Sequence, residues 1–414
     1  MSKLSQLLQN VSLKNFLNLS LNQGINVLVA LVMTPYLFQT LGEDQFGLVN
    51  LGLTVILLFG ILVNYGFNLN VPKQLALIAN DRKAKEGLIN EVIITRLSIC
   101  FLLVLLIYVA TQYLGLFAGY SFILLFATVQ LLNDALYPMF ILQGLDRLGW
   151  ISKANAISKL AYLGLVIWLV QGPEDARWVN FFLGGAGAVV HGLLLVFIYR
   201  SLAIRLHWVS ARKIFLRLQD NFQFFSSTVA SYVLLNGGFI MLKNFVTESE
   251  LGFYAIALRV SLILRLLPVF IAQSILQHAT RLHQEAEEQF EKYLLNSCRK
   301  GLLVTFLIGL GFAVTAKWVV RVLAGEYIEL SAQLMAILCF LPFLGMFNVA
   351  NVIRLLVKDQ KRILARASWI TALLMLALGA VGAHYFDSLG MAGALVVAEV
   401  FNYWIHRYFL SRIK

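Results

Sequence analysis

The chain has 414 residues, of which 60% are hydrophobic and only 13% are charged, and its formal net charge is +12. In soluble domains roughly a quarter of the residues are charged, so this composition excludes an ordinary soluble protein and indicates an integral membrane protein. The three cysteines, Cys100, Cys298 and Cys339, have no paired spacing and predict neither a disulfide framework nor a metal site.

Apolar windows long enough to cross a bilayer recur along the whole chain. A hydrocarbon core of about 30 Å needs roughly 20 apolar residues per crossing. The sequence therefore predicts an all-α membrane protein with twelve transmembrane helices at 15–40, 46–70, 88–113, 118–143, 152–171, 177–200, 219–245, 250–275, 298–320, 331–357, 363–383 and 391–409. The longest polar connections, 71–87, 201–218 and 276–297, are too short for a soluble domain.

Basic residues are unevenly shared between the two sides of the predicted bundle. With a cytoplasmic N-terminus, the inner segments hold 24 Lys and Arg residues and the outer segments hold four. The positive-inside rule then places both termini in the cytoplasm. Basic loops against anionic membrane lipid account for the net charge, so no nucleic-acid partner is expected.

The first span carries a stripe of amides at helical spacing. Its members are Asn15, Asn18, Asn22 and Asn26, which share one helical face because they are three or four positions apart. Two interpretations are open: the amides bond to neighbouring helices, at about 0.6 to 2 kcal/mol each, or they line a polar cavity.

The second half of the chain repeats features of the first. A shift of 205 positions places Gly47 over Gly252, and it places the asparagine stripe over Asp220, Gln223, Ser227 and Ser231. Six helices per half, both entering from the cytoplasm, predict two parallel six-helix repeats around a central cavity. The predicted domains are an N-terminal bundle at 1–200, a cytoplasmic linker at 201–218 and a C-terminal bundle at 219–414.

Ionisable residues at membrane depth are the candidates for function, because burying them is costly. Five are basic and two are acidic, which leaves a surplus of +3: Arg96, Lys159, Arg259, Arg265 and Arg354 against Asp134 and Glu399. We expect the cations Arg259, Arg265, Lys159 and Arg354 to line a cavity that binds an anionic substrate.

Some of these charges have alternative explanations. Arg96 and Asp134 lie at similar depth and could form a structural pair across the third and fourth spans, although Asp134 could also bind a coupling ion. Lys159 and Arg354 lie nearer the cytoplasmic ends, where long side chains can reach the interface.

Arg259 is the sharpest candidate for substrate binding. It lies too deep to reach the interface easily, and the planar guanidinium forms bidentate hydrogen bonds with phosphate. The competing interpretation is that Arg259 pairs with Glu399, and Arg265 lies at a depth comparable to that of the same carboxylate.

Two further features have structural explanations at this stage. His191, in the sixth span, could carry a proton, but the favoured interpretation is a structural histidine bonded to another helix. Gly184, Gly185 and Gly187 predict close packing of helices.

Several short motifs together resemble those of a known family. These are Thr34-Pro35-Tyr36, Leu41-Gly42 before Phe46-Gly47, Tyr65-Gly66-Phe67, and the loop Gln143-Gly144-Leu145-Asp146-Arg147. With the twelve-helix plan, they are similar to the O-antigen flippases of the Wzx type, in the multidrug/oligosaccharidyl-lipid/polysaccharide exporter superfamily.

The resemblance implies a function and partners. Such a protein would move an undecaprenyl-diphosphate-linked oligosaccharide from the cytoplasmic to the periplasmic leaflet of the bacterial inner membrane, by alternating access of two halves. A polysaccharide polymerase and a chain-length regulator would be its partners, alongside membrane lipid, and no cofactor is expected.

The sequence lacks the motifs of an enzyme. It has no phosphate-binding glycine loop with its lysine, no metal-spaced histidine pair and no long outer loop, which favours a carrier. Two alternatives remain: an ion-coupled drug exporter of the same superfamily, which would need unpaired acids, and a non-transporting member of a glycan-assembly complex.

Overall fold

Helices make up nearly all of the protein. A computed structural model describes the backbone of residues 11–78 and 80–412, and their side chains except those of residues 11–21, 277, 281, 284 and 361. The chain is 87% helical, with no strand in the part that is described. Within the same residues, nine helical stretches are long and apolar enough to cross a membrane. The all-α, multi-pass membrane class predicted from composition is confirmed.

Two of these nine stretches each contain two of the predicted spans. In α2 (Val11–Asn64) the helix is interrupted at Gly42, whose φ of 76° suits a residue without a side chain. In α18 (Lys361–Ser411) the interruption lies at Phe386 and Asp387. Both interruptions fall in the connections expected between spans. The predicted span 152–171 forms α8 (Leu148–Leu169), which is not among the nine stretches, so the count of twelve stays a prediction.

The chain divides into two compact units. The first comprises Met1–Tyr36 and Gly52–Thr228, and the second comprises Leu37–Leu51 and Val229–Lys414. Compared with the predicted domains, 37–51 joins the C-terminal part and 219–228 joins the N-terminal part. These differences follow from packing, because each segment contacts helices of the unit to which it is assigned, as described below.

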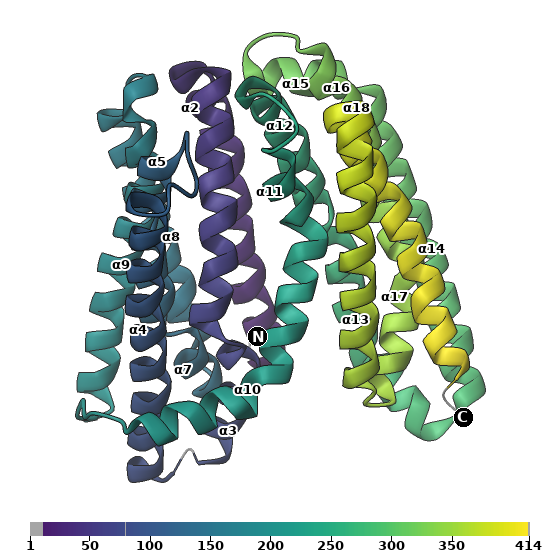
Figure 1. The fold of residues 1–414 in the computed structure, drawn as a ribbon. Helices are drawn as coiled ribbons and strands as arrows, with labels where there is room; N and C mark the ends of the chain where they lie inside the picture. Colours follow the sequence, from purple (N-terminus) through teal and green to yellow (C-terminus); the bar gives the residue numbers. More distant parts are fainter. Residues whose placement is uncertain (1–10, 79, 413–414) are drawn as a thin grey trace, which may run out of the picture. The chain divides into compact units, whose positions relative to one another are not determined.

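The first unit is a helical bundle in which α8 and α9 run side by side (Figure 1). Besides its share of α2 and of α10 (Ala211–Tyr232), it contains α3 (Phe67–Leu77), α4 (Arg82–Gln112), α5 (Ser121–Ala127), α6 (Val129–Leu136), α7 (Met139–Gly144), α8, η1 (Pro173–Asp175) and α9 (Ala176–Ser201).

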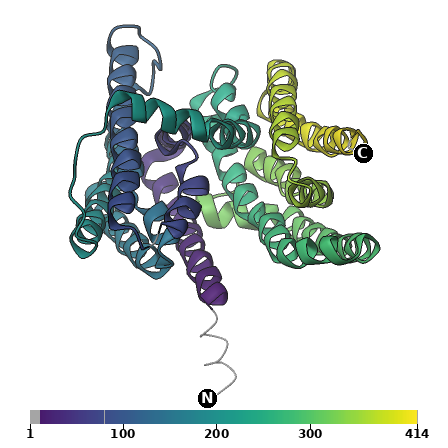
Figure 2. The same ribbon diagram turned by 90° about the horizontal axis from the view of Figure 1, so that it is seen from below.

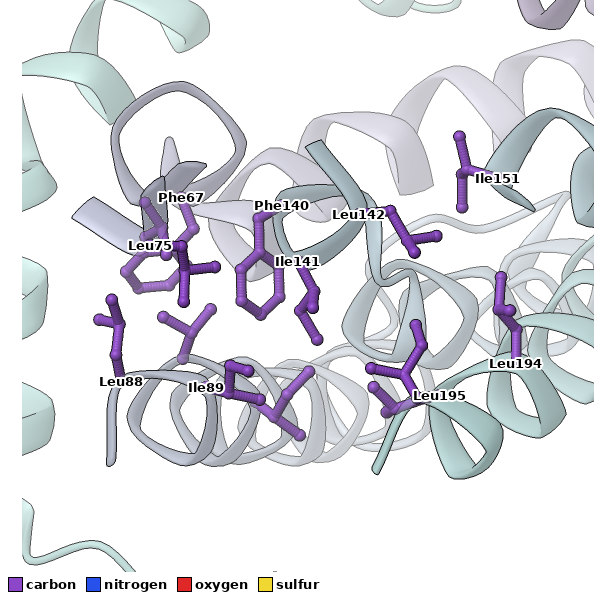
Figure 3. Packing of buried hydrophobic residues seen from close by; sticks show 14 of the residues in the cluster. Phe67, Leu75, Leu88, Ile89, Phe140, Ile141, Leu142, Ile151, Leu194 and Leu195 are labelled. Atoms are coloured by element: carbon purple, nitrogen blue, oxygen red, sulfur yellow. The ribbon is translucent and has the colours of Figure 1, made fainter. Parts of the chain in front are cut away.

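One apolar core joins several helices of the first unit. Phe67 and Leu75 of α3 point toward Ile89 of α4 and toward Phe140 of α7 (Figure 3). All four side chains are fully buried. This core holds the short helices α3 and α7 against α4 and so positions the polar side chains that these helices carry.

The second unit is also a bundle, and α18 packs along α17 and α11. After its share of α2 and α10, it contains η2 (Val233–Gly237), a π-helical turn, then α11 (Gly238–Leu242), α12 (Glu248–Leu264), α13 (Leu266–Glu285), α14 (Glu287–Val314), α15 (Ala316–Ala324), α16 (Glu329–Leu338), α17 (Leu341–Val357) and α18. Phe290, Leu294 and Met346 lie in an apolar core shared by α13, α14 and α17.

Large apolar side chains also cover the outside of the long helices. Phe101 is 74% exposed, Trp168 is 73% exposed and Leu373 is 58% exposed. Lipid tails are as apolar as these side chains, so helices that face lipid keep such residues on the outer face.

The first part of α10 crosses the ends of α3 and α4, as Figures 1 and 2 show. Arg217 Nε donates to Glu91 Oε2 of α4 at 2.6 Å, and Asn70 Nδ2 of α3 donates to Asn221 Oδ1 at 3.1 Å. Tyr65 stacks on Phe225 with ring centroids 4.3 Å apart. These contacts explain why 219–228 belongs to the first unit.

The helix starts that the shift of 205 aligns are packed directly on each other within the second unit. A Cβ added at Gly47 would overlap the carbonyl oxygen of Glu248, and one added at Gly252 would overlap that of Glu43. Glu248 and Gly252 lie 205 positions after Glu43 and Gly47, so the shift exchanges the two contacts. Contacts across a two-fold axis are reciprocal in the same way. Ser249 Oγ also donates to Asp44 Oδ1 at 2.7 Å, across 205 positions. The contact favours the predicted repeat.

Glycines allow α6 and α9 to approach closely. A Cβ at Gly184 would overlap the backbone at Gln130, and one at Gly187 would overlap the amide of Asn133. Gly185 faces open space. The predicted packing role therefore holds for Gly184 and Gly187 and is wrong for Gly185.

Candidate functional site

Arg259 contacts an amide and an aromatic ring in the second unit. It lies half-buried on α12, where its Nη2 donates to Asn50 Oδ1 at 2.5 Å. The guanidinium carbon lies 5.9 Å from the centre of the Phe46 ring, and Asn50 in turn donates to the Phe46 carbonyl oxygen at 2.7 Å. Arg259 is thus oriented by an amide and an aromatic face.

Glu399 is paired with Arg265. Arg265 Nη2 lies 3.2 Å from Glu399 Oε1, and the two side chains are only 13% and 7% exposed. Arg265 caps the end of α12, where the helix breaks before α13 and directs the side chain toward α18. Of the two arginines that the sequence left as partners of Glu399, the structure gives this contact to Arg265.

A chain of polar side chains continues from this ion pair along α18. Asn402 Nδ2 donates to Glu399 Oε2 at 3.2 Å, and Thr371 Oγ1 donates to Asn402 Oδ1 at 3.1 Å. His406 Nδ1 lies 2.9 Å from the Asn402 carbonyl oxygen. Glu399, Asn402 and His406 are three and four positions apart, so they share one face of α18.

The chain of contacts then passes to α17. Asn348 Nδ2 lies 3.2 Å from His406 Nδ1, Asn351 donates to Asn348 at 3.3 Å, and Arg354 donates to Asn351 at 3.3 Å. Arg354 also donates to both carboxylate oxygens of Glu291 on α14, at 2.8 and 2.6 Å.

The pairing of Arg354 corrects the expectation that it is an available cavity cation. Glu291 lies in the polar connection expected at 276–297, but α14 begins at Glu287 and presents this carboxylate to Arg354. A bidentate carboxylate contact already neutralises the guanidinium. Glu399 was already counted among the internal acids, so Glu291 alone lowers the predicted surplus, from +3 to +2.

Arg96 lies at the centre of the first unit and is fully buried. It donates to the Tyr137 carbonyl oxygen at 3.0 Å and to Asn68 Oδ1 at 2.8 Å, and its guanidinium carbon lies 4.8 Å from the centre of the Phe140 ring. Among the described residues no ion pair joins Arg96 to Asp134. The possible ion pair is not formed, because Asn68 of α3 and Tyr137 at the end of α6 accept from the two terminal nitrogens of Arg96, and the guanidinium interacts with Asp134 only electrostatically.

Asp134 and Lys159 lie in the same unit on different helices. Gln130 Nε2 donates to Asp134 Oδ1 at 3.4 Å, and the carboxylate lies against Gly60, where a Cβ would overlap it. Lys159 is half-buried on α8 and interacts electrostatically with Asp134 and His191. The structure brings these three ionisable groups into one polar region of the first unit.

Two members of the asparagine stripe point into the interior of this unit. Asn26 Oδ1 accepts from Asn155 of α8 at 3.2 Å, and the side chain of Asn22 hydrogen-bonds with that of Tyr137. Another helix therefore takes at least one hydrogen bond of each. Asn15 and Asn18 lie outside the residues whose side chains are described.

The positions of α10 that the shift of 205 aligns with the asparagine stripe differ from it in burial and in hydrogen bonding. Asp220, Gln223 and Ser231 are exposed, and Ser227 Oγ donates within its own helix to the Phe224 carbonyl oxygen at 3.0 Å. The buried polar residue there is Asn221, whose contact with Asn70 the sequence reading missed.

A duplicated histidine contact was also missed. His191 Nδ1 lies 2.8 Å from Asn133 Oδ1, and the contact of His406 with Asn348 has the same separation of 58 positions. Both imidazoles are 2% exposed, and each leaves its Nε2 buried without a hydrogen bond among the described residues. The equal Asn-to-His spacing in the two halves was the signal that could have identified this pair.

Comparison with known proteins gives the following relatives. The profile of a family described as polysaccharide biosynthesis protein matches residues 12–277. A protein of Escherichia coli (strain K12), provisionally named an O-antigen transporter, is 24% identical over 398 residues, which cover 93% of each chain. A provisionally named low-salt glycan biosynthesis flippase of Haloferax volcanii is 24% identical over 375 residues, covering 90% of this chain and 77% of the relative.

Solved structures of the same architecture include two transporters at 14% identity. An inward-facing multidrug resistance MATE family transporter of the MOP superfamily has a TM-score of 0.74, covering 96% of this chain and 98% of the other. The lipid II flippase MurJ, in an inward closed conformation, has a TM-score of 0.72, with 96% and 87% covered. The chain has the fold of these transporters.

Proposed function

The chain belongs to the polysaccharide biosynthesis protein family, and from that premise we propose that it is a flippase for a lipid-linked oligosaccharide with an anionic headgroup. Family membership confirms the resemblance noted in the sequence. The relatives are named as transporters and flippases, so the chain is a membrane transporter and not an enzyme.

The finer proposal concerns substrate, direction and topology. The substrate is an undecaprenyl-diphosphate-linked repeat unit, moved from the cytoplasmic to the periplasmic leaflet of an inner membrane. The chain crosses the membrane twelve times, with two six-helix halves at 1–200 and 219–414, a linker at 201–218 and cytoplasmic termini. A polymerase and a chain-length regulator would use the product outside.

Arg259 is the observation that carries this proposal. A diphosphate needs a positive partner inside an otherwise apolar wall, and guanidinium offers it paired donors that match phosphate oxygens. Asn50 and Phe46 orient the group, and a guanidinium keeps its charge on burial. Arg265 and Lys159 would assist, and the amides of the stripe would bond to sugar hydroxyls where other helices leave them available.

The test replaces Arg259 with Ala in cells whose surface polysaccharide depends on this chain. A charge-assisted hydrogen bond contributes about 1.5 to 3 kcal/mol, so transport should fall at least about tenfold. The matched control is Arg321→Ala, which removes an exposed arginine of α15. Both variants must be present in the membrane at the native level. Normal surface polysaccharide in the Arg259 variant would overturn the proposal.

A second candidate is an ion-coupled exporter of cationic small molecules. It is favoured by the likeness in fold to a multidrug transporter and by Asp134, whose carboxylate lies in the interior of the first unit. In that case Asp134→Asn would abolish ion-dependent drug export while Arg259→Ala would leave it intact. If the chain is a flippase for anionic lipids, lipid transport should be lost in Arg259→Ala and retained in Asp134→Asn.

A further inference from the structure

We propose that binding of the anionic headgroup at Arg265 is linked to protonation of Glu399, so that the loaded carrier holds one proton more than the empty one. This inference rests on the proposed function. It adds Arg265 to the binding site, where the headgroup and Glu399 compete for the guanidinium. The starting observation is the Arg265–Glu399 contact at 3.2 Å, with both side chains more than four-fifths buried.

A headgroup at Arg265 must displace Glu399 from at least part of the guanidinium. An ionised carboxylate that is buried without its cation is unfavourable by several kcal/mol, and such groups neutralise instead. Glu399 would then take one proton from water and form a carboxylic O–H bond, while Arg265 keeps its charge for the phosphate oxygens. No covalent bond of the lipid changes.

The surroundings of Glu399 offer support for the neutral acid. Asn402, which donates to Glu399 Oε2, is held by Thr371 of the first segment of α18, so this oxygen keeps its hydrogen bond in either protonation state. The protonated oxygen would be Oε1, which Arg265 vacates. The site is therefore shaped to hold Glu399 both with and without its proton.

The other ionisable groups near Glu399 are few. On its own helix stand Tyr403, one turn from Glu399, and His406. From α12 come Arg265 and the buried phenol of Tyr254, while Glu250 of α12 meets α18 at Ser388, eleven positions before Glu399. From α17, Arg354 reaches His406 only through Asn351 and Asn348 and is itself neutralised by Glu291. The segments η2 and α11 carry no ionisable residue, and α16 carries only Glu329 at its first position. None of these is a carboxylate that could replace Glu399 as the partner of Arg265.

Linkage gives the proposal a measurable form. If one proton is taken up with each headgroup, the affinity falls tenfold for each unit that the pH rises, over the range in which free Glu399 is ionised and bound Glu399 is protonated. Glu399→Gln is nearly isosteric, carries no charge and needs no proton. It should bind more tightly than the native protein at neutral pH, with an affinity that no longer changes in this way.

The experiment uses the full chain in lipid nanodiscs and undecaprenyl diphosphate as the probe. Calorimetric titration in two buffers of different ionisation enthalpy counts the protons taken up per lipid bound. The native protein should take up about one more proton than Glu399→Gln, and subtracting the variant removes any proton exchange by the diphosphate itself. The matched control, Glu291→Gln, alters the other arginine–carboxylate pair and should behave like the native chain.

The outcomes distinguish a failure of this inference from a failure of the proposed function. Native binding with the same proton count as Glu399→Gln overturns this inference and leaves the flippase proposal standing. No binding of the lipid by the native chain overturns both. If Glu399→Gln does not fold, infrared difference spectra of the native protein decide: lipid must induce a band of a protonated carboxylic acid, and its absence contradicts the proposal.

Discussion

At the residue scale, two arginine–carboxylate pairs of the second unit differ in burial. The Arg265–Glu399 pair is 13% and 7% exposed, whereas the Arg354–Glu291 pair is 22% and 36% exposed. Removing one partner of a buried pair leaves a buried charge and costs about 3 to 5 kcal/mol, while more exposed pairs contribute at most about 1 kcal/mol.

This difference predicts a clear order of stability. Glu399→Ala should lower the free energy of unfolding by several kcal/mol, and Glu291→Ala by about 1 kcal/mol, as measured by denaturant titration in detergent micelles. Each loss should largely disappear when the partner arginine is also replaced. Equal losses for the two variants would show that burial does not govern these pairs.

The sequence identified which ionisable residues are internal, but it could not assign their partners. Depth along a helix follows from counting residues, and the membrane depth of these residues stays a prediction, although Arg96, Arg265 and Glu399 are buried within the protein. Partners depend on the rotation of each helix and on its neighbours. For this reason Arg96 contacts Asn68 instead of Asp134, and Glu291 was overlooked.

At the element scale, the close contact between the starts of two helix segments depends on two glycines. Alanine at Gly47 or Gly252 would place a methyl group against backbone atoms of Glu248 or Glu43, which cannot move aside as a side chain can. Each substitution should destabilise the protein by about 1 to 3 kcal/mol, the usual range for overpacking.

Thermal unfolding of the two alanine variants tests this contact. Gly185→Ala is the control, because Gly185 lies in the helix α9 and faces open space. That control should be neutral or stabilising, since alanine favours helices over glycine by about 1 kcal/mol. Native stability in both Gly47→Ala and Gly252→Ala would contradict the packing described here.

Hydropathy and turn residues predicted most of the elements. The interruptions at Gly42 and at Phe386–Asp387 lie between expected spans, and α4 and α9 match 88–113 and 177–200 to within several residues. The first part of α10 was missed as a helix, because residues 211–218 were read as a basic linker. This part of α10 is held by tertiary contacts, among them Arg217 with Glu91, which no local sequence pattern predicts.

At the scale of the whole molecule, internal duplication was predicted from a shift of 205 and gains support from two structural contacts. Asp44 and Ser249 are 205 positions apart and bond to each other, and an Asn–His contact with a separation of 58 occurs twice, at a shift of 215. We expect the contact between these equivalent segments to open during transport.

A disulfide between Asp44→Cys and Ser249→Cys would test that expectation. Their side chains are within 2.7 Å in this structure, and the three native cysteines are buried. Oxidation should stop transport and reduction should restore it, whereas either single cysteine variant should transport under both conditions. Full transport by the oxidised double variant would show that these segments stay together throughout the cycle.

The central claim is that this chain moves a lipid-linked, anionic oligosaccharide across a bilayer. The most direct measurement reconstitutes the purified native chain into liposomes with a fluorescent undecaprenyl-diphosphate-linked oligosaccharide and follows the lipid that becomes accessible to an impermeant quencher. The account predicts that the native chain accelerates movement between leaflets and that Arg259→Ala removes most of this acceleration. Movement no faster than in protein-free liposomes, from a correctly folded native chain, would contradict it.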